Sequence, residues 1–134
     1  MRNLTLLLTA LVFSLTMMFS SPCFAEWTKV SENVDGTTSY VDFDGIRKVG
    51  GYVYFWVLTD YLKPKLGDLS VKVYNQGDCK LFRGKPLSFY SYKEPMGGGT
   101  GDVSEPVKEV QGWMYPLPNS VDEIMLKSVC AYVK

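Results

Sequence analysis

The alternation of apolar and polar positions predicts a series of strands followed by one helix. Alternating stretches, typical of half-buried strands, occupy residues 27–32, 37–43, 52–61, 69–74 and 80–92. Turn-forming residues separate them: Asp35-Gly36, Gly50-Gly51, Pro64 with Gly67, and Gly77-Asp78. Residues 93–118 lose this periodicity, apart from a short edge strand predicted at 113–115, before Pro116.

The segment 52–61 is apolar on both of its faces. Because successive side chains of a strand point in opposite directions, one face carries Tyr52, Tyr54, Trp56 and Leu58, and the other carries Val53, Phe55, Val57 and Tyr61. A strand that buries both faces is central in its sheet. We therefore expect a helix over one face, and over the other either a loop such as 93–112 or a second copy of the chain in a homodimer.

The helix is predicted near the C-terminus. Ser120 with Glu123 three residues later forms a capping box. Apolar residues then recur at helical spacing, at Val121, Ile124, Met125, Val129 and Tyr132 or Val133. The predicted fold class is α+β: an antiparallel sheet of five to six strands with one C-terminal helix packed on one face.

The first 25 residues have the pattern of a secretory signal peptide. Arg2 precedes an apolar run from Leu4 to Phe19, and Cys23-Phe24-Ala25 resembles a cleavage site. We expect cleavage between Ala25 and Glu26, which leaves residues 26–134 as one exported domain. Lipidation at Cys23 is the alternative, but the Ser-Ser-Pro that precedes it is a poor lipoprotein signal.

Charge and hydropathy limit the classes of partner that the protein can bind. The chain has 14 basic and 14 acidic side chains, and the exported part loses Arg2. A balanced charge excludes a dedicated nucleic-acid binder and argues against adsorption to an anionic membrane. After the leader, no apolar run approaches the ~20 residues of a transmembrane helix. We expect a protein of the periplasm or the medium, or of the outer-membrane surface if Cys23 is lipidated.

The sequence offers little catalytic chemistry. It contains no histidine, so histidine general bases and imidazole metal ligands are excluded. The Gly-rich stretch 97–101 lacks the Gly-Lys-Ser/Thr ending of a phosphate loop. Asp42 and Asp44 fit a turn better than a metal site, and no pair of acids stands out as a glycosidase pair, although such a pair remains open. We therefore expect no cofactor, no metal and no enzymatic activity.

The two cysteines that follow the leader are Cys79 and Cys130. In an exported domain they allow one intramolecular disulfide, which would join the predicted helix to a turn of the sheet. The alternative is a reactive thiol, which needs an activating cation or base nearby.

Aromatic residues are abundant, with three Trp, nine Tyr and seven Phe. They fit a β-rich core, and Tyr and Trp also supply rigid contact area for recognition. The flexible Gly-rich loop can adapt to a partner. The candidate binding residues are therefore Met96, Gly97, Gly98, Gly99, Thr100, Gly101 and Trp113.

Residues 26–131 resemble the surface-adhesin protein E family. The similarity is carried by the order and spacing of Trp27–Glu32, Tyr40–Asp44, Leu58–Pro64, Gln76–Arg83, Trp113 and the 120–130 helix. The resemblance implies an antiparallel sheet with a C-terminal helix tied on by a disulfide, at positions that match Cys79 and Cys130. It also implies that members can be dimers, and that the founding type is an outer-membrane adhesin that binds host matrix proteins.

Two classes of function follow. The first is an exported, non-catalytic binding module that recognises an extracellular-matrix protein or a glycan. The second is a small periplasmic protein that acts on the envelope as an enzyme inhibitor or, with less support from the residues, as a hydrolase of envelope polymers. The absence of histidine and of any assembled catalytic signature favours the first class.

Overall fold

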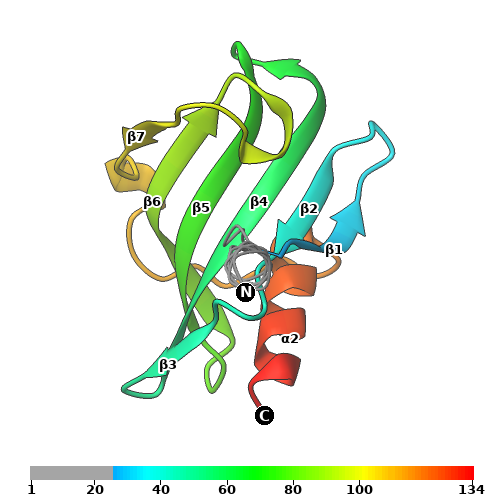
Figure 1. Ribbon diagram of the computed structural model, residues 1–134. Helices are drawn as coiled ribbons and strands as arrows, with labels where there is room; N and C mark the ends of the chain where they lie inside the picture. The colour runs from blue at the N-terminus through cyan, green and yellow to red at the C-terminus, as the bar shows by residue number, and fades with distance from the viewer. Residues whose placement is uncertain (1–25) are drawn as a thin grey trace, which may run out of the picture.

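The doubly apolar segment 52–61 is the first part of a long central strand, β4 (Tyr52–Lys65), in the computed structural model, which describes residues 26–134 (Figure 1). Along one edge β4 pairs with β2 (Thr38–Val41) and, nearer its start, with β3 (Arg47–Val49); along the other it pairs with β5 (Asp68–Asp78). The central position predicted for this segment is confirmed.

The remaining strands extend the sheet on both sides. β1 (Thr28–Glu32) pairs with β2, and β6 (Arg83–Tyr92) joins β5 to β7 (Asp102–Ser104). All pairings are antiparallel, and the sheet has seven strands in the order β1-β2-β4-β5-β6-β7, with β3 on β4. The predicted fold class is confirmed, and β3 and β7 are additional strands. Each spans three residues, too few for alternation to show in the sequence.

Two turns differ from their predicted positions. β4 continues through Pro64, and the hairpin turn is formed by Leu66 and Gly67 alone. The pairing of β4 with β5 is irregular between Asp60 and Lys65. Pro64, which has no N–H to donate, is therefore tolerated in this part of the strand. β5 likewise continues to Asp78, and the turn that we expected at 77–78 lies at 79–82.

The predicted edge strand at 113–115 is reduced to a single bridge. Met114 pairs with Gly84 at the start of β6, through N–H···O bonds of 2.8 and 3.0 Å in the two directions. Two short 3₁₀ turns, η2 (Pro95–Gly97) and η3 (Lys108–Val110), lie in the aperiodic region before it.

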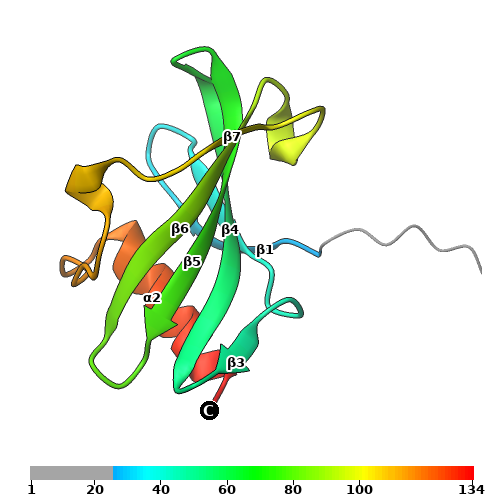
Figure 2. The same cartoon turned by 90° about the vertical axis from the view of Figure 1, so that its left-hand side faces the viewer.

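The helix α2 (Val121–Tyr132) begins as the sequence predicts. The Glu123 amide donates to the Ser120 hydroxyl (3.2 Å), and the Glu123 carboxylate accepts from the Asn119 amide (3.3 Å). The first contact satisfies an amide that the first turn of a helix leaves without a partner, and the second satisfies the amide of the residue before the N-cap. α2 lies along one face of the sheet, and the loop that contains η2 lies on the opposite side (Figure 2).

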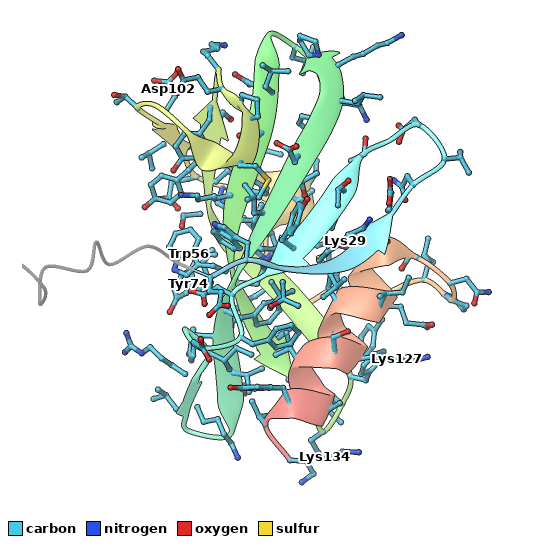
Figure 3. The ribbon with its side chains drawn as sticks, turned by 45° about the vertical axis from the view of Figure 1, so that its right-hand side comes forward. Lys29, Trp56, Tyr74, Asp102, Lys127 and Lys134 are labelled. Carbon is cyan, nitrogen blue, oxygen red and sulfur yellow. A yellow bond between two sulfur atoms is a disulfide. The ribbon has the colours of Figure 1, made fainter. Side chains whose placement is uncertain are left out.

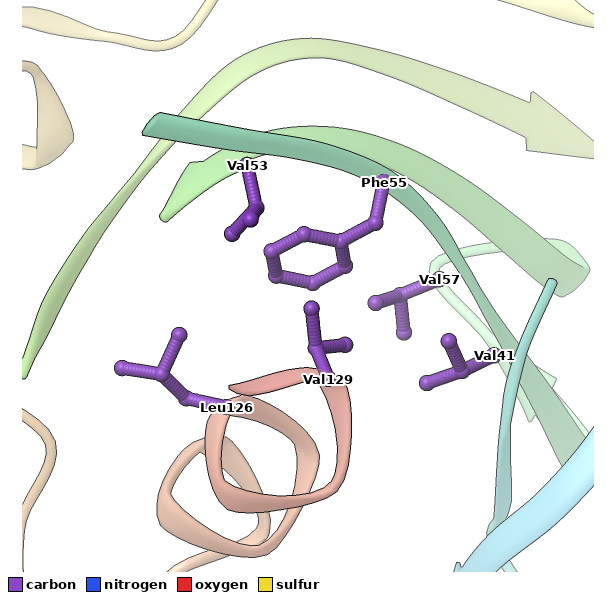
Figure 4. Packing of buried hydrophobic residues seen from close by; sticks show 6 residues of the cluster. All are labelled: Val41, Val53, Phe55, Val57, Leu126 and Val129. Atoms are coloured by element: carbon purple, nitrogen blue, oxygen red, sulfur yellow. The ribbon is translucent and has the colours of Figure 1, made fainter. Parts of the chain in front are cut away.

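The core is formed between α2 and β4. Val53, Phe55 and Val57 point toward Leu126 and Val129 of the helix, with Val41 of β2 beside them (Figure 4). The buried residues of α2 are Val129, which the predicted stripe included, and Leu126, which it omitted. Ile124 and Tyr132, which it included, are 37% and 56% exposed.

Gly77 explains how closely the helix approaches the sheet. A Cβ at this position of β5 would lie 2.9 Å from a Val53 methyl and 3.1 Å from a Leu126 methyl. No side chain fits there without displacement of the core. The glycine that we expected to begin a turn thus permits the contact between strand and helix.

The disulfide is present between Cys79, directly after β5, and Cys130, near the end of α2. The two Cα atoms are 5.6 Å apart, and the cysteines are 51 positions apart in sequence. The predicted pairing is confirmed, and it joins the helix to the turn between β5 and β6.

Asp78 organises that turn. Its carboxylate accepts hydrogen bonds from the amides of Lys80 and Leu81 (both 3.1 Å) and from Nε of Arg83 (3.0 Å), and the residue is 5% exposed. The bond from the Leu81 amide contributes most to holding the pKa of Asp78 below its usual value, and those from Arg83 and Lys80 act in the same direction.

This lowered pKa predicts a loss of stability in acid. A carboxylate whose pKa is lower in the folded than in the unfolded state contributes stability above the unfolded value, near 4. That contribution is lost as the pH falls through the folded pKa. We expect Asp78→Asn to destabilise the protein at pH 7, and the difference from the unmodified protein to shrink below about pH 4. Urea unfolding from pH 7 to 3 tests this, with Asp102→Asn at an exposed position of β7 as the control. A constant difference over that range would contradict it.

Candidate functional site

The face of the sheet away from α2 carries a continuous group of aromatic side chains. Tyr52, Tyr54 and Trp56 alternate along β4 with the core residues, so they point to the opposite side. Across the sheet, Trp56 pairs with Tyr74 in register, and Lys72 pairs with Tyr90. With Trp113, these residues form what we call the aromatic face: Tyr52, Tyr54, Trp56, Tyr74, Tyr90 and Trp113.

The rings of the aromatic face contact one another. The ring centroids are 4.7 Å apart for Trp56 and Tyr74, 5.4 Å for Trp56 and Tyr90, and 6.2 Å for Tyr54 and Tyr74. Trp56 and Tyr74 lie next to each other on the side of the molecule away from α2 (Figure 3). All six side chains are half-buried, so each keeps surface that a partner can contact.

Basic side chains lie over Trp113 and over two aromatic rings next to this face, Tyr92 and Trp27. The guanidinium of Arg83 is 4.4 Å and Nζ of Lys85 is 4.8 Å from the Trp113 ring centroid. Nζ of Lys72 is 5.0 Å from the ring of Tyr92 and 5.8 Å from that of Trp27. These distances are within the range of cation–π attraction.

The Gly-rich loop is attached at one end of this face. The Met96 amide donates to Asp60 (2.7 Å), and the Gly97 amide donates to the Ser70 hydroxyl (2.8 Å), which itself donates to the Glu94 carbonyl (2.6 Å). Gly97 has φ +69°, and a Cβ there would lie 2.4 Å from Cε of Lys72. The start of the predicted binding loop is therefore fixed against the sheet.

The other loop residues are more open. Gly99 and Thr100 are exposed, whereas Gly98 and Gly101 are partly covered. Trp113 lies at the opposite end of the face, where its ring is 5.4 Å from that of Tyr52. Tyr52 and Asp60 are eight positions apart on β4, or roughly 26 Å. The structure thus places the two predicted parts of the binding site at opposite ends of one surface and does not bring them into contact.

The sequence interpretation did not identify the basic members of this surface. The sequence analysis placed Lys72 in the strand 69–74, and Arg83 and Lys85 in the strand 80–92, without a role in binding. The signal available was the spacing of two between Lys72 and Tyr74, which puts both on one face of β5. The positions of the basic residues over Trp27 and Trp113 join residues at least 28 positions apart, which no local pattern reveals.

A separate hollow lies on the helix side of the sheet. It has a volume of about 480 Å³ and lies between β4, β5, β6, α2 and the segment 110–117. Most of its lining is apolar, including Phe55, Val73, Phe89 and Met125. This space can accept an apolar group, but neither the predicted loop 96–101 nor Trp113 borders it.

The described residues show how the possible metal ligands are used. Asp42 accepts a hydrogen bond from the Gly45 amide (3.1 Å), as expected for a turn. Within residues 26–134, no group of three or more Cys, Asp or Glu side chains is placed to hold a metal ion. In the same range, no helix has the length and apolarity needed to cross a membrane.

Comparison with known proteins places the chain in a structural context. The family model for surface-adhesin protein E matches residues 27–131. Two crystal structures of Haemophilus influenzae protein E superimpose with TM-scores of 0.60 and 0.58, at 20% and 18% identity. The first match covers 84% of this chain and 94% of the other, and the second covers 82% and 87%. Protein E from non-typeable Haemophilus influenzae gives 0.54 at 19% identity, over 83% and 79%. No curated protein matches the sequence.

Proposed function

The chain belongs to the surface-adhesin protein E family, and from this premise we propose that residues 26–134 are an exported, adhesin-like binding module whose aromatic face binds an extracellular-matrix protein or glycan. The observation that carries the proposal is the cluster around Trp56 and Tyr74, whose rings are 4.7 Å apart and half-buried. Tyr and Trp are enriched at the energetic centres of interfaces because they combine large contact area with few rotatable bonds.

The proposed site includes the two features predicted from sequence. The loop 96–101 borders one end of the aromatic face, and Trp113 borders the other. We propose that the tethered start of the loop orients its exposed part, Gly99 and Thr100, toward a partner on this face. The proposed activity is binding without turnover. Catalysis near pH 7 needs a group that exchanges protons in that range or a metal-bound water, and the chain has no histidine to serve as that group or as a metal ligand.

The proposed route to the exterior depends on the leader. Residues 1–25, which include Cys23 and Ala25, lie outside the residues that the structure describes. We propose a mature N-terminus at Glu26 and, therefore, a protein of the periplasm or the medium, with display on the outer membrane only if Cys23 is lipidated.

The test is substitution at the centre of the aromatic face. We expect Trp56→Ala to weaken binding to a responsive member of a panel of extracellular-matrix proteins by about 30-fold or more, the effect of losing a central aromatic anchor. Biolayer interferometry with the purified domain measures this. Tyr132→Ala is the matched control, because Tyr132 is 56% exposed and lies on α2, on the other face of the sheet.

Melting temperatures distinguish loss of the site from loss of the fold. Tyr74→Ala provides a second variant of the same cluster if Trp56→Ala is poorly folded. Undiminished binding by both folded variants would contradict the proposal, as would reproducible hydrolysis of the ligand that one Asp or Glu substitution abolishes.

The predicted homodimer would use the same face. The loop around η2 covers one end of this face. Trp56 and Tyr74 still expose part of their side chains, to which a second copy could bind. We propose that a second copy and a ligand compete for this surface, so that the aromatic face is free in the binding-competent form. Sedimentation at micromolar concentration, with and without ligand, determines which occupant it takes.

A further inference from the structure

We infer that the ligand of the aromatic face is an extended anionic glycan, a chain that bears sulfate or carboxylate groups. This inference rests on the function proposed above and specifies the chemistry of its partner. It follows from the charges that the fold brings to this face, how those charges are held, and the shape of the surface.

The first observation is a local excess of positive charge. Residues paired in register on antiparallel strands share a face. Arg47 is paired with Tyr54 in this way. Lys85 is paired with Gln76, and the next pair on the same face is Arg83 with Asp78. With Lys72, the face carries four basic side chains. Of the acidic residues near the rings, Asp78 is paired with Arg83, and Asp60 accepts from the Met96 amide. Arg47, Lys72 and Lys85 therefore outnumber the one acidic residue, Asp60, that has no basic partner among them. Since the whole sequence has balanced charge, this excess is a property of the face and is complementary to an anion.

The second observation is that the aromatic rings hold the cations in place. Lys72 lies over Trp27 and Tyr92, and Arg83 and Lys85 lie over Trp113. Arg83 is held further by its ion pair with Asp78, at 3.0 Å. Long basic side chains normally lose conformational entropy when they bind an anion, and prior ordering reduces that cost.

The third observation concerns how the rings are presented. Trp56 and Tyr74 are tilted by 33° and Tyr54 and Tyr74 by 32° at short distances, so neighbouring rings cover part of one another's faces. Side chains of a strand stand roughly perpendicular to the sheet, which turns ring edges and tyrosine hydroxyls outward. Ring edges carry the positive part of the aromatic quadrupole. Edges, hydroxyls and cations together suit a ligand rich in anionic and hydroxyl oxygens.

The spacing requires a polymer. Lys72 and the partner position of Lys85, Gln76, are four residues apart on β5, or about 13 Å. A single small anion cannot reach both cations, whereas an extended chain can lie along the strands from one to the other.

The shape of the surface favours a glycan over an acidic polypeptide. Polypeptide partners anchor aromatic and aliphatic side chains in well-packed pockets. The 480 Å³ hollow described above lies on the helix side. A second hollow, of about 580 Å³, is lined by Cys79, Lys80 and the end of α2, and it reaches the aromatic face at Tyr52. Neither hollow is lined by the central rings, which are Tyr54, Trp56, Tyr74 and Tyr90. The central part of the aromatic face is a sheet surface formed by side chains of β4, β5 and β6, over which an oxygen-rich chain can lie.

The experiment uses a sulfated heparin-derived oligosaccharide as the probe, with isothermal titration calorimetry on residues 26–134. We expect the double variant Lys72→Gln/Lys85→Gln to bind at least ~10-fold more weakly than the unmodified domain. The control is Lys63→Gln/Lys127→Gln, which removes the same charge at exposed positions of the β4 hairpin end and of α2. It should bind as the unmodified domain does, and the fully desulfated oligosaccharide should not bind.

Each other outcome overturns the inference. Equal weakening in both double variants would show attraction to positive charge anywhere on the domain, and absence of heparin binding would remove the ligand class. Tighter binding of poly-glutamate would identify an acidic polypeptide as the partner. If a matrix protein binds through Trp56 while the sulfated probe does not, the proposed function stands and only this inference fails.

Discussion

Removal of the Cys79–Cys130 disulfide is expected to lower the free energy of unfolding by about 4 kcal/mol. The bond closes a loop across 51 residues, and closing a loop of this length restricts the unfolded chain by that amount in the chain-entropy model. A small domain has a total stability of only ~5–15 kcal/mol, so the loss is large. The double variant Cys79→Ala/Cys130→Ala, unfolded in urea beside the unmodified domain, measures it.

The position of the bond predicts where the loss is felt. Cys130 holds the end of α2 to the turn after β5, whereas the hydrogen bonds of the sheet do not involve it. We therefore expect the sheet to persist at room temperature while the melting temperature falls and amide exchange in α2 accelerates. Reduction of the unmodified domain is the matched experiment without mutation. Unchanged stability in both cases, or two titratable thiols in the exported protein, would contradict the prediction.

Phe55→Ala is expected to destabilise the domain by about 3–5 kcal/mol, the usual range for a phenylalanine truncated in a core. Phe55 is 5% exposed and lies between β4 and α2, in the cluster with Leu126 and Val129 (Figure 4). It also forms part of the wall of the 480 Å³ hollow. Truncation would enlarge that hollow and remove the contacts of Phe55 with the helix. These contacts can be regained only if neighbouring side chains move into the space.

Two further variants separate core packing from binding. Phe55→Leu keeps most of the buried apolar volume and should cost less than about 1.5 kcal/mol. Tyr54→Ala, one position earlier, changes the aromatic face instead; it should cost less stability than Phe55→Ala and weaken ligand binding. Urea unfolding and binding measured on the same three variants test both. A smaller cost for Phe55→Ala than for Tyr54→Ala would show that the core had been placed on the wrong face.

The helix and the central strand could be predicted from local sequence because each depends on short-range chemistry. Ser120 and Glu123 lie within one helical turn, so their capping contacts are encoded by spacing alone. The apolar residues on both faces of segment 52–61 are likewise close together in the sequence, and they predicted the central position of β4. The disulfide followed because only two cysteines remain after the leader.

Other features depended on partners distant in sequence. The three-residue strands β3 and β7 are too short to have a pattern and exist because β4 and β6 supply their hydrogen bonds. The sequence placed a turn at Gly77, where the fold needs a residue without a side chain beneath Leu126. The buried side of α2 was displaced from the predicted stripe for the same reason: the sheet that it packs against decides which residues are covered.

The candidate site divides in the same way. Composition alone shows that the chain is rich in Tyr and Trp, has no histidine and carries a Gly-rich loop, and composition of this kind favours binding over catalysis. The folded chain was needed to show that Trp56, Tyr74 and Tyr90 share one face, that the loop and Trp113 lie at its two ends, and that Lys72 and Lys85 lie over aromatic rings. The reason is physical: strand register and twist assemble a surface from residues tens of positions apart, and no pattern along the chain records which of them will meet.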